Sequence, residues 1–321
     1  MNSTALLRRM LPRLVGVTVL VAGAVLVYRD RSSLQQAVTT IGAPTAALAL
    51  LCALLGTVCI EQVWLSVLGG LGAVVPGSEA ARVFLVSQLG KYLPGSVWPV
   101  LAQMELGRRR GIPRATMLAA NILMLTVVTA TGLLTGAALL PWSSAAGLRE
   151  HWWTLLLIPP LLGLLHPRAI PAVVDRLLRL AGRPPIGARV APAGMVRAVL
   201  WGFGTWALLG AHLYLMLHAL GGRGGAAVAA SVGGMALAFA AGLIVVPAPA
   251  GAGIREAVIV ATFSGLLPTS AALAVALASR ALLVVADVTL AAGAGLLGRR
   301  RTDADLPQPE AGVGRGDSSE V

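Results

Sequence analysis

Long, continuous apolar runs are the feature of this sequence that most limits its fold. Only 12% of the residues are charged and 57% are hydrophobic, whereas a soluble domain carries about 25% charged residues. A run of about 20 apolar residues is long enough for a helix to cross the hydrocarbon core of a bilayer. Lipid offers the backbone no hydrogen-bond partners, so a spanning segment must be a helix or part of a closed barrel. The runs do not alternate with polar residues, and we therefore expect an all-α polytopic membrane protein.

We expect about eight transmembrane helices, with one or two broken or re-entrant segments. The expected crossings comprise residues 14–28, 41–68, 115–140, 152–166, 199–220, 226–246, 254–267 and 271–297. Residues 254–267 are short for a span, so we expect them to cross either alone or with a partner half-helix. Residues 1–300 should form one membrane domain, and residues 301–321, rich in Pro, Gly, Asp and Glu, a disordered tail.

The arginines predict the orientation of the chain. The net charge of +12 is concentrated in short loops, a pattern that sets membrane topology and does not indicate nucleic-acid binding. The clusters near the N-terminus and at residues 108–114, 168–197 and 299–301 should all be cytoplasmic, as should both termini. Residues 69–82 and 105–114 then lie on one side, so the segment 83–104 must enter and leave there. We expect it to be re-entrant.

One stretch of the longest loop has helical, amphipathic spacing. It reads AVVDRLLRLAGR and covers residues 172–183. Such a segment either lies along the lipid headgroups or forms an ordinary cytoplasmic loop whose charge sets topology. The sequence leaves both interpretations open.

Motifs of soluble enzymes are missing from the sequence. It has no Walker A motif, no HExxH, no GxSxG and no nucleotide-binding glycine pattern. Cys52 and Cys59, the two cysteines, do not have zinc or redox spacing. We therefore expect no enzymatic activity, no cofactor and no metal.

Charged residues at membrane depth are the strongest functional signal. Each costs about 2.5–3.5 kcal/mol to insert, so such residues usually face an internal cavity and mark a substrate path. Arg280 and Asp287 lie seven positions apart, near one helix face. The candidates are Glu61, Lys91, Arg255, Glu256, Arg280 and Asp287.

Two proline- and glycine-rich breaks accompany these charges. GKYLPGSVW contains Lys91, the only lysine of the chain, and PAPAGAGIREAV contains Arg255. Each break should leave the N-terminus of a half-helix inside the membrane, where free N–H groups favour an anion such as phosphate. Paired broken helices in the two halves of a membrane protein indicate a transporter's binding site. Alternatively, the breaks only kink helices and the charged side chains extend to the interface.

The two segments together resemble the membrane domain of lysylphosphatidylglycerol synthases. The matching residues are Lys91, Tyr92, Leu93, Pro94, Gly95, Val97 and Trp98, and then Pro247 or Pro249, Gly251, Gly253, Arg255 and Glu256. The resemblance covers about residues 10–300. It implies a flippase-like domain of the bacterial inner membrane that moves a lipid between leaflets. The chain ends about 20 residues after its last expected span, so we expect no aminoacyl-transferase domain.

From the motifs and the resemblance we expect a translocator of an anionic or zwitterionic lipid, either a phospholipid or a polyprenyl-phosphate lipid. The expected substrate-binding residues are Lys91, Tyr92, Pro94, Gly95, Trp98, Gly251, Gly253, Arg255 and Glu256. The acids Glu61, Glu256 and Asp287 would balance the cations or bind a cationic headgroup. The alternative is a non-transporting subunit or scaffold of an envelope glycosyltransferase or lipid-modifying enzyme. The sequence indicates no nucleic-acid partner, and it leaves the oligomeric state open.

Overall fold

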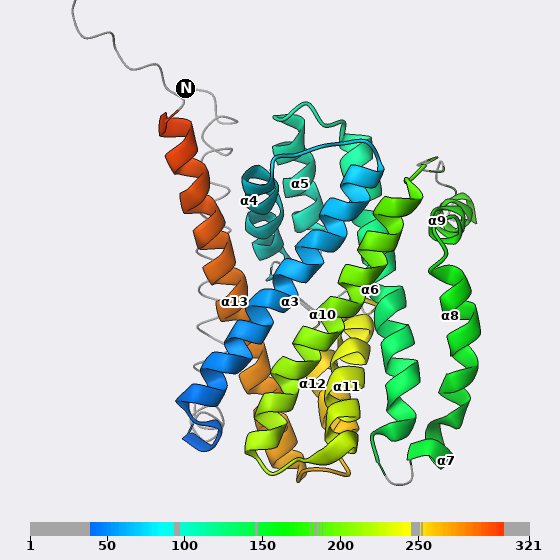
Figure 1. The fold of residues 1–321 in the computed structure, drawn as a ribbon, viewed down its shortest axis with the longest axis vertical. Coiled ribbons are helices and arrows are strands. Elements are labelled where there is room, and N and C mark those ends of the chain that lie inside the picture. Colours follow the sequence, from blue (N-terminus) through cyan, green and yellow to red (C-terminus); the bar gives the residue numbers. More distant parts are fainter. Residues whose placement is uncertain are drawn as a thin grey trace, which may run out of the picture.

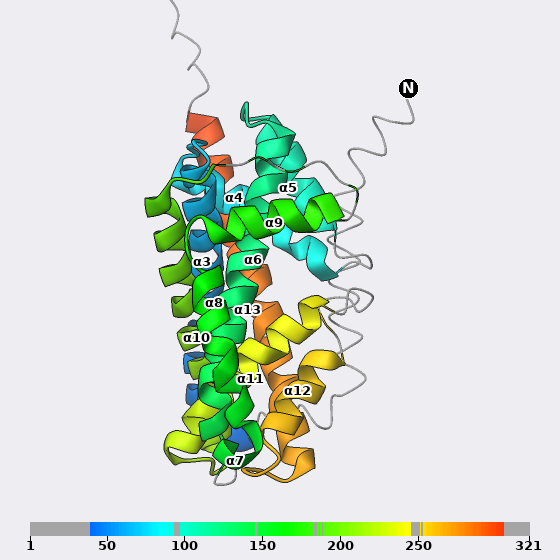
Figure 2. The ribbon, with the colours of Figure 1, turned by 90° about the vertical axis from the view of Figure 1, so that its right-hand side faces the viewer.

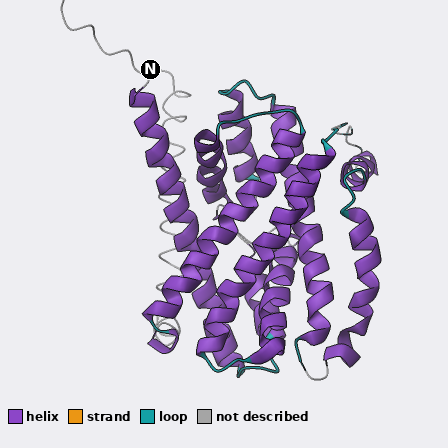
Figure 3. Ribbon diagram, viewed as in Figure 1, coloured by secondary structure: helices purple, strands orange, loops and turns teal. Residues whose placement is uncertain are grey.

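The computed structural model describes residues 39–92, 97–144, 147–180, 182, 185, 187, 189–244, 251 and 253–304, without the side chains of Leu177, Ile244 and residues 297–304. All regular structure in these residues is helical (Figure 3). The elements are α3 (Ala43–Gly70), α4 (Gly77–Gln88), η1 (Leu89–Tyr92), α5 (Trp98–Arg108), α6 (Arg114–Leu139), η2 (Leu140–Trp142), α7 (Gly147–His151), η3 (Trp152–Leu157), α8 (Ile158–Leu164), α9 (Ala169–Leu180), α10 (Pro192–Ala219), α11 (Gly224–Ile244), α12 (Ile254–Thr262) and α13 (Thr269–Ala304).

Five of the described helices are long and apolar enough to cross a membrane: α3, α6, α10, α11 and α13. The segment from α7 to α8, taken with α9, makes a sixth candidate that bends by 97°. The expectation of an all-α polytopic membrane protein is confirmed. The expected count of eight crossings stays a prediction, because the proposed first helix, residues 14–28, lies outside the described residues. α13 continues to Ala304, beyond the expected start of the tail, and residues 305–321 are not described.

The bundle has two distinct ends (Figure 1). At one end, which we call the basic end, lie residues 71–76, 108–114 and 189–197 and the end of α13. At the other, the aromatic end, lie residues 140–144, 220–223 and 263–268 and the start of α3. Trp142, Trp152 and Trp153 are more than half exposed there, as in an interfacial aromatic belt.

Small residues bring the two halves of the chain into close contact along α3 and α10. These helices run antiparallel, with Gly56 against Leu209 and Gly70 against Gly194. A Cβ atom added to Gly194 would lie 2.8 Å from the Cα atom of Gly70. Glycine at this position therefore allows the two backbones to approach, as is common in membrane helices.

The first short hairpin, α4–η1–α5, enters the bundle from the basic end and returns to it (Figures 1 and 2). An ion pair between Glu79, in the first turn of α4, and Arg110, just after α5, joins the two ends of the hairpin. α4 has 12 residues and α5 has 11, too few for either to cross alone. The hairpin agrees with the expectation that residues 83–104 enter and leave on one side, and their re-entrance in a membrane stays a prediction.

The second short hairpin, α11–α12, enters from the aromatic end (Figure 2). The helices are antiparallel, since Gly242 packs against Arg255 and Gly234 against Thr262. α12 has nine residues, too short for a crossing, and it runs back toward the end where α11 begins. Of the two expected crossings, residues 226–246 correspond to α11, which is long and apolar enough to span, whereas α12 does not cross alone. Because the hairpin returns, α13 still starts at the aromatic end and finishes at the basic end.

Candidate functional site

A cavity of about 130 Å³ lies where the two hairpins meet the long helices. A cavity of this volume has room for several waters. Its walls come from both halves of the chain and are mostly apolar, including Ile60, Leu125 and Leu283. Six of the polar residues predicted from sequence line it: Lys91, Tyr92, Arg255, Glu256, Arg280 and Asp287. The structure thus brings together residues that lie far apart in the chain.

Asp287 of α13 holds the inner end of the first hairpin. Its carboxylate lies 2.7 Å from the Nζ atom of Lys91 and accepts a hydrogen bond from the hydroxyl of Tyr92. The Asp287 side chain is 4% exposed and that of Lys91 33%. A buried carboxylate requires such partners because burial removes its hydration. Lys91, the only lysine of the chain, is therefore paired with an acid in this structure.

Glu256 of α12 is held in a similar way by the second hairpin and α13. One of its oxygens lies 2.5 Å from Nη1 of Arg280, and the other accepts a hydrogen bond of 2.7 Å from the backbone N–H of Gly253. The second contact caps the N-terminus of α12. That N–H group, which the sequence suggested as an anion donor, is thus already occupied by the protein's own carboxylate.

Arg255 differs from the other two cations of the cavity. Among the residues that the structure describes, no carboxylate lies within ion-pair distance of its guanidinium. Its Nε atom is buried without a hydrogen-bond partner, and its Cζ atom lies 4.4 Å from the centre of the Phe239 ring. Stacking on an aromatic face compensates only part of the lost hydration of a cation. Among the described residues, no carboxylate thus balances the charge of Arg255 directly, which favours the approach of an anion.

The formal charges of the cavity sum to one positive charge. Lys91, Arg255 and Arg280 contribute three positive charges, and Glu256 and Asp287 contribute two negative charges. Two cations are paired, so the excess resides on Arg255. In apolar surroundings this arrangement attracts a singly charged anion strongly.

The other residues predicted from sequence to bind the substrate or to carry charge at membrane depth are not among the described polar residues that line the cavity. Glu61 is 5% exposed in α3 but is not among the residues that line the cavity. Trp98 is 38% exposed and packs on Gly90, and Gly251 packs on Gly242. Pro94 and Gly95 lie outside the described residues. That any of these residues binds a substrate stays a prediction.

Sequence reasoning missed several residues of the cavity wall. Phe239 lies under Arg255, and Ser279 precedes Arg280. The Oγ atom of Ser279 lies 2.9 Å from Nε2 of His212, whose Nδ1 is 2.9 Å from the carbonyl oxygen of Ala49. This buried histidine joins α10 to α3 and α13. Neither Phe239 nor Ser279 carries a motif, so only tertiary contacts identify them.

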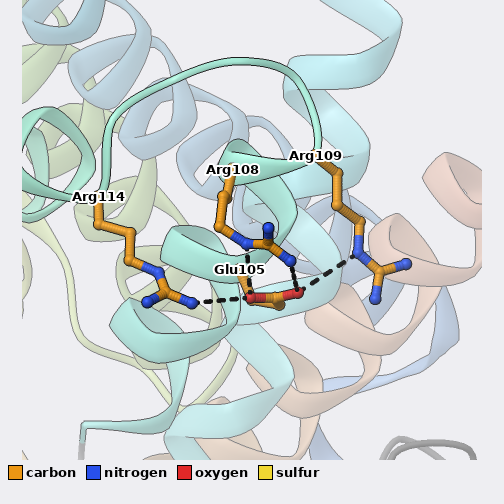
Figure 4. A network of polar contacts seen from close by, with 4 residues as sticks. All are labelled: Glu105, Arg108, Arg109 and Arg114. Atoms are coloured by element: carbon orange, nitrogen blue, oxygen red, sulfur yellow. Dashed lines mark hydrogen bonds and ion pairs between the residues drawn. The ribbon is translucent and has the colours of Figure 1, made fainter.

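An exposed ion cluster lies at the basic end, away from the cavity (Figure 4). Arg108, Arg109 and Arg114 surround the carboxylate of Glu105 at 3.0–3.6 Å. The hydrogen bond from Arg108 is the main reason that the pKa of Glu105 falls to about 2. Exposed pairs of this kind contribute little to stability, and the cluster mainly adds positive charge to this end.

Comparison with known proteins agrees with the motifs. A family model described as the lysylphosphatidylglycerol synthase TM region matches residues 13–291. A search of curated proteins found no match. The family match covers most of the chain, including both hairpins and all six charged or phenolic residues of the cavity. It makes the chain a multi-pass membrane protein of lipid metabolism or transport. The chain belongs to the family of the lysylphosphatidylglycerol synthase transmembrane region.

Proposed function

We propose that this protein translocates a lipid with an anionic or zwitterionic headgroup, and that Arg255 binds the phosphate of that headgroup. The observation that carries the proposal is the Arg255 guanidinium, which has no carboxylate partner among the described residues, inside a cluster whose other charges are paired. Guanidinium groups bind phosphate oxygens through two parallel hydrogen bonds. A phosphate bound there would replace hydration that the Arg255 guanidinium loses on burial.

The pairing of the other charges favours transport over permanent binding. Lys91 and Arg280 would each strengthen phosphate binding if they left their acids, but Asp287 and Glu256 compete for them. A site that bound phosphate with three free cations would release it slowly. Partial neutralisation keeps the affinity moderate, which a translocator needs because the lipid must also leave.

The two hairpins offer a route to both leaflets. One enters from the basic end and the other from the aromatic end (Figure 2), and the cavity lies between them. Displacing one hairpin at a time would open the cavity to one side only, as in transporters with broken helices. The headgroup would pass through the polar cluster while the acyl chains remained against apolar helices or in the bilayer.

We further propose that the protein resides in a bacterial inner membrane with its basic end and both termini in the cytoplasm. The positive-inside rule supports this orientation, since the arginine-rich loops gather at that end. We also propose that the described domain performs no aminoacyl transfer itself. An incubation with aminoacyl-tRNA and phosphatidylglycerol should then yield no aminoacylated lipid.

Lipid exchange in proteoliposomes tests the proposal. Purified protein is reconstituted with a headgroup-labelled phosphatidylglycerol, and the fraction of label reached by an external reductant reports exchange between leaflets. Arg255→Gln should lower the protein-dependent rate at least tenfold, since the variant loses the unpaired charge. Arg149→Gln, at an exposed position of α7, is the matched control and should exchange normally. A folded Arg255→Gln protein with the native rate would refute the proposal and favour a role as a subunit of an envelope glycosyltransferase.

A further inference from the structure

The helix α9 is not part of the cavity, and its geometry suggests a separate role. It follows α8 after a bend of 97° between the two segments and therefore lies across the bundle (Figure 2). In Figure 1 it is seen nearly end-on, level with the first turns of α10. α10 is one of the membrane-spanning candidates and starts at Pro192. A helix perpendicular to the spans, at the level where a span begins, lies in the plane of the membrane surface.

The residues of α9 are segregated by chemistry. Ile170 and Val174 are buried against the bundle. Arg176 and Arg179 are exposed, and at 100° per residue they project from the opposite side of the helix. Val173 is 38% exposed and Leu180 75%. These two apolar side chains lie between the buried face and Arg176. The helix thus presents an apolar strip next to a basic one, as helices in the headgroup region do.

The charges of α9 remain available to a ligand. Neither Arg176 nor Arg179 forms an ion pair with another described residue. Asp175, the only acid of the helix, accepts a hydrogen bond of 3.3 Å from the backbone N–H of Gly187 in the following loop. The exposed face of α9 is therefore positive, and it complements negative lipid headgroups.

We propose that α9 is an interfacial helix that binds anionic phospholipid headgroups of the surrounding membrane through Arg176 and Arg179, with Val173 and Leu180 inserted between the acyl chains. The lipids bound here are structural neighbours of the protein, and the site is independent of the cavity. Each arginine near an anionic surface should raise the local preference for anionic lipid about fivefold.

A fluorescent probe on α9 tests this inference. The native cysteines are replaced by alanine (Cys52→Ala and Cys59→Ala), and Leu180→Cys carries the probe. The full protein is reconstituted in vesicles that contain nitroxide-labelled phosphatidylglycerol or, separately, nitroxide-labelled phosphatidylcholine. Quenching should be several-fold stronger with the phosphatidylglycerol. Arg176→Gln/Arg179→Gln should bring the two quenching values close together, and so should high salt. The control Arg149→Gln should leave their ratio unchanged.

Two outcomes would overturn the inference. Equal quenching by both lipids in the native sequence would mean that α9 lies at the membrane surface without selecting anionic headgroups. Weak quenching by both lipids, together with strong quenching by aqueous iodide, would mean that α9 faces water and is free to bind a soluble partner. Retained activity in the lipid-exchange assay by the double arginine variant would separate this inference from the function proposed for the cavity.

Discussion

The two hairpins approach the same cavity from opposite ends, but they bring different charges to it. The first hairpin supplies Lys91, which Asp287 neutralises. The second supplies Arg255, which has no acid partner among the described residues, and Glu256, which Arg280 neutralises. α13 provides the partner in both cases. Charge thus anchors the first hairpin to α13, whereas in the proposed function the second also presents to the substrate a cation that no described carboxylate balances.

The largest expected difference between the hairpins concerns transport. Arg255→Gln should slow lipid exchange at least tenfold, because it removes the unpaired charge. Lys91→Gln should slow it only about two- to fivefold, because Asp287 already offsets much of the lysine's attraction for an anion. The same proteoliposome assay measures both variants. Equal losses would mean that the two cations act on the substrate alike and that the comparison is wrong.

The next effect is on stability. Asp287→Asn should destabilise the protein by about 3 kcal/mol, because it leaves the Lys91 ammonium without its acid in a partly buried position. The double variant Lys91→Gln/Asp287→Asn should recover a large part of this loss, since no unpaired charge remains. Thermal unfolding in detergent measures both variants. If the double variant is less stable than Asp287→Asn alone, the ion pair does not anchor the first hairpin.

A smaller effect concerns the backbone that begins α12. Gly253 has a φ of 84°, which a residue with a Cβ atom adopts only at a cost of about 1–3 kcal/mol. Gly72 has a φ of 83° in the loop after α3, and it serves as the matched control. Gly253→Ala and Gly72→Ala should reduce stability similarly in thermal unfolding. Only Gly253→Ala should also slow lipid exchange, because it displaces the turn that precedes Arg255. Slower exchange in both variants would indicate a general effect of strain.

The smallest expected effect on stability concerns Glu105, at the exposed end of the first hairpin. The arginines around Glu105 lower its pKa to about 2 from an ordinary value near 4.3. A lowered pKa contributes stability that is fully present above about pH 4.3 and is lost as the pH falls through about 2. The difference in melting temperature between native protein and Glu105→Gln should therefore be small, constant from pH 8 to 5, and vanishing toward pH 2. A difference that grows on acidification would contradict this reading of the cluster.

The sequence predicted much of this architecture because membrane folds follow from composition. A segment in lipid must satisfy its own backbone hydrogen bonds, which favours apolar helices. The arginines on either side of residues 83–104 are expected on the same face of the membrane, so the sequence predicts the first hairpin. The return of α12 was harder to predict. Its apolar residues are compatible with part of a span, and only packing of Gly234 on Thr262 and of Gly242 on Arg255 shows its direction.

The sequence also predicted which residues form the site, but not how their charges are paired. Charges at membrane depth pointed to Lys91, Arg255, Arg280 and Asp287, because their insertion cost requires a compensating environment. Which acid pairs with which cation could not be predicted, since the pairs join residues 24 and 196 positions apart. The absence of a described acid next to Arg255, on which the proposed function depends, is likewise visible only in three dimensions.

Direct identification of bound lipid tests the central claim that Arg255 holds a lipid phosphate. The protein is extracted in mild detergent and examined by native mass spectrometry, with the retained lipids identified after dissociation. The account predicts that the native protein retains a phosphate-containing lipid, that Arg149→Gln retains it equally, and that Arg255→Gln loses it. Retention of the same lipid by Arg255→Gln, at the occupancy of the native protein, would contradict the account.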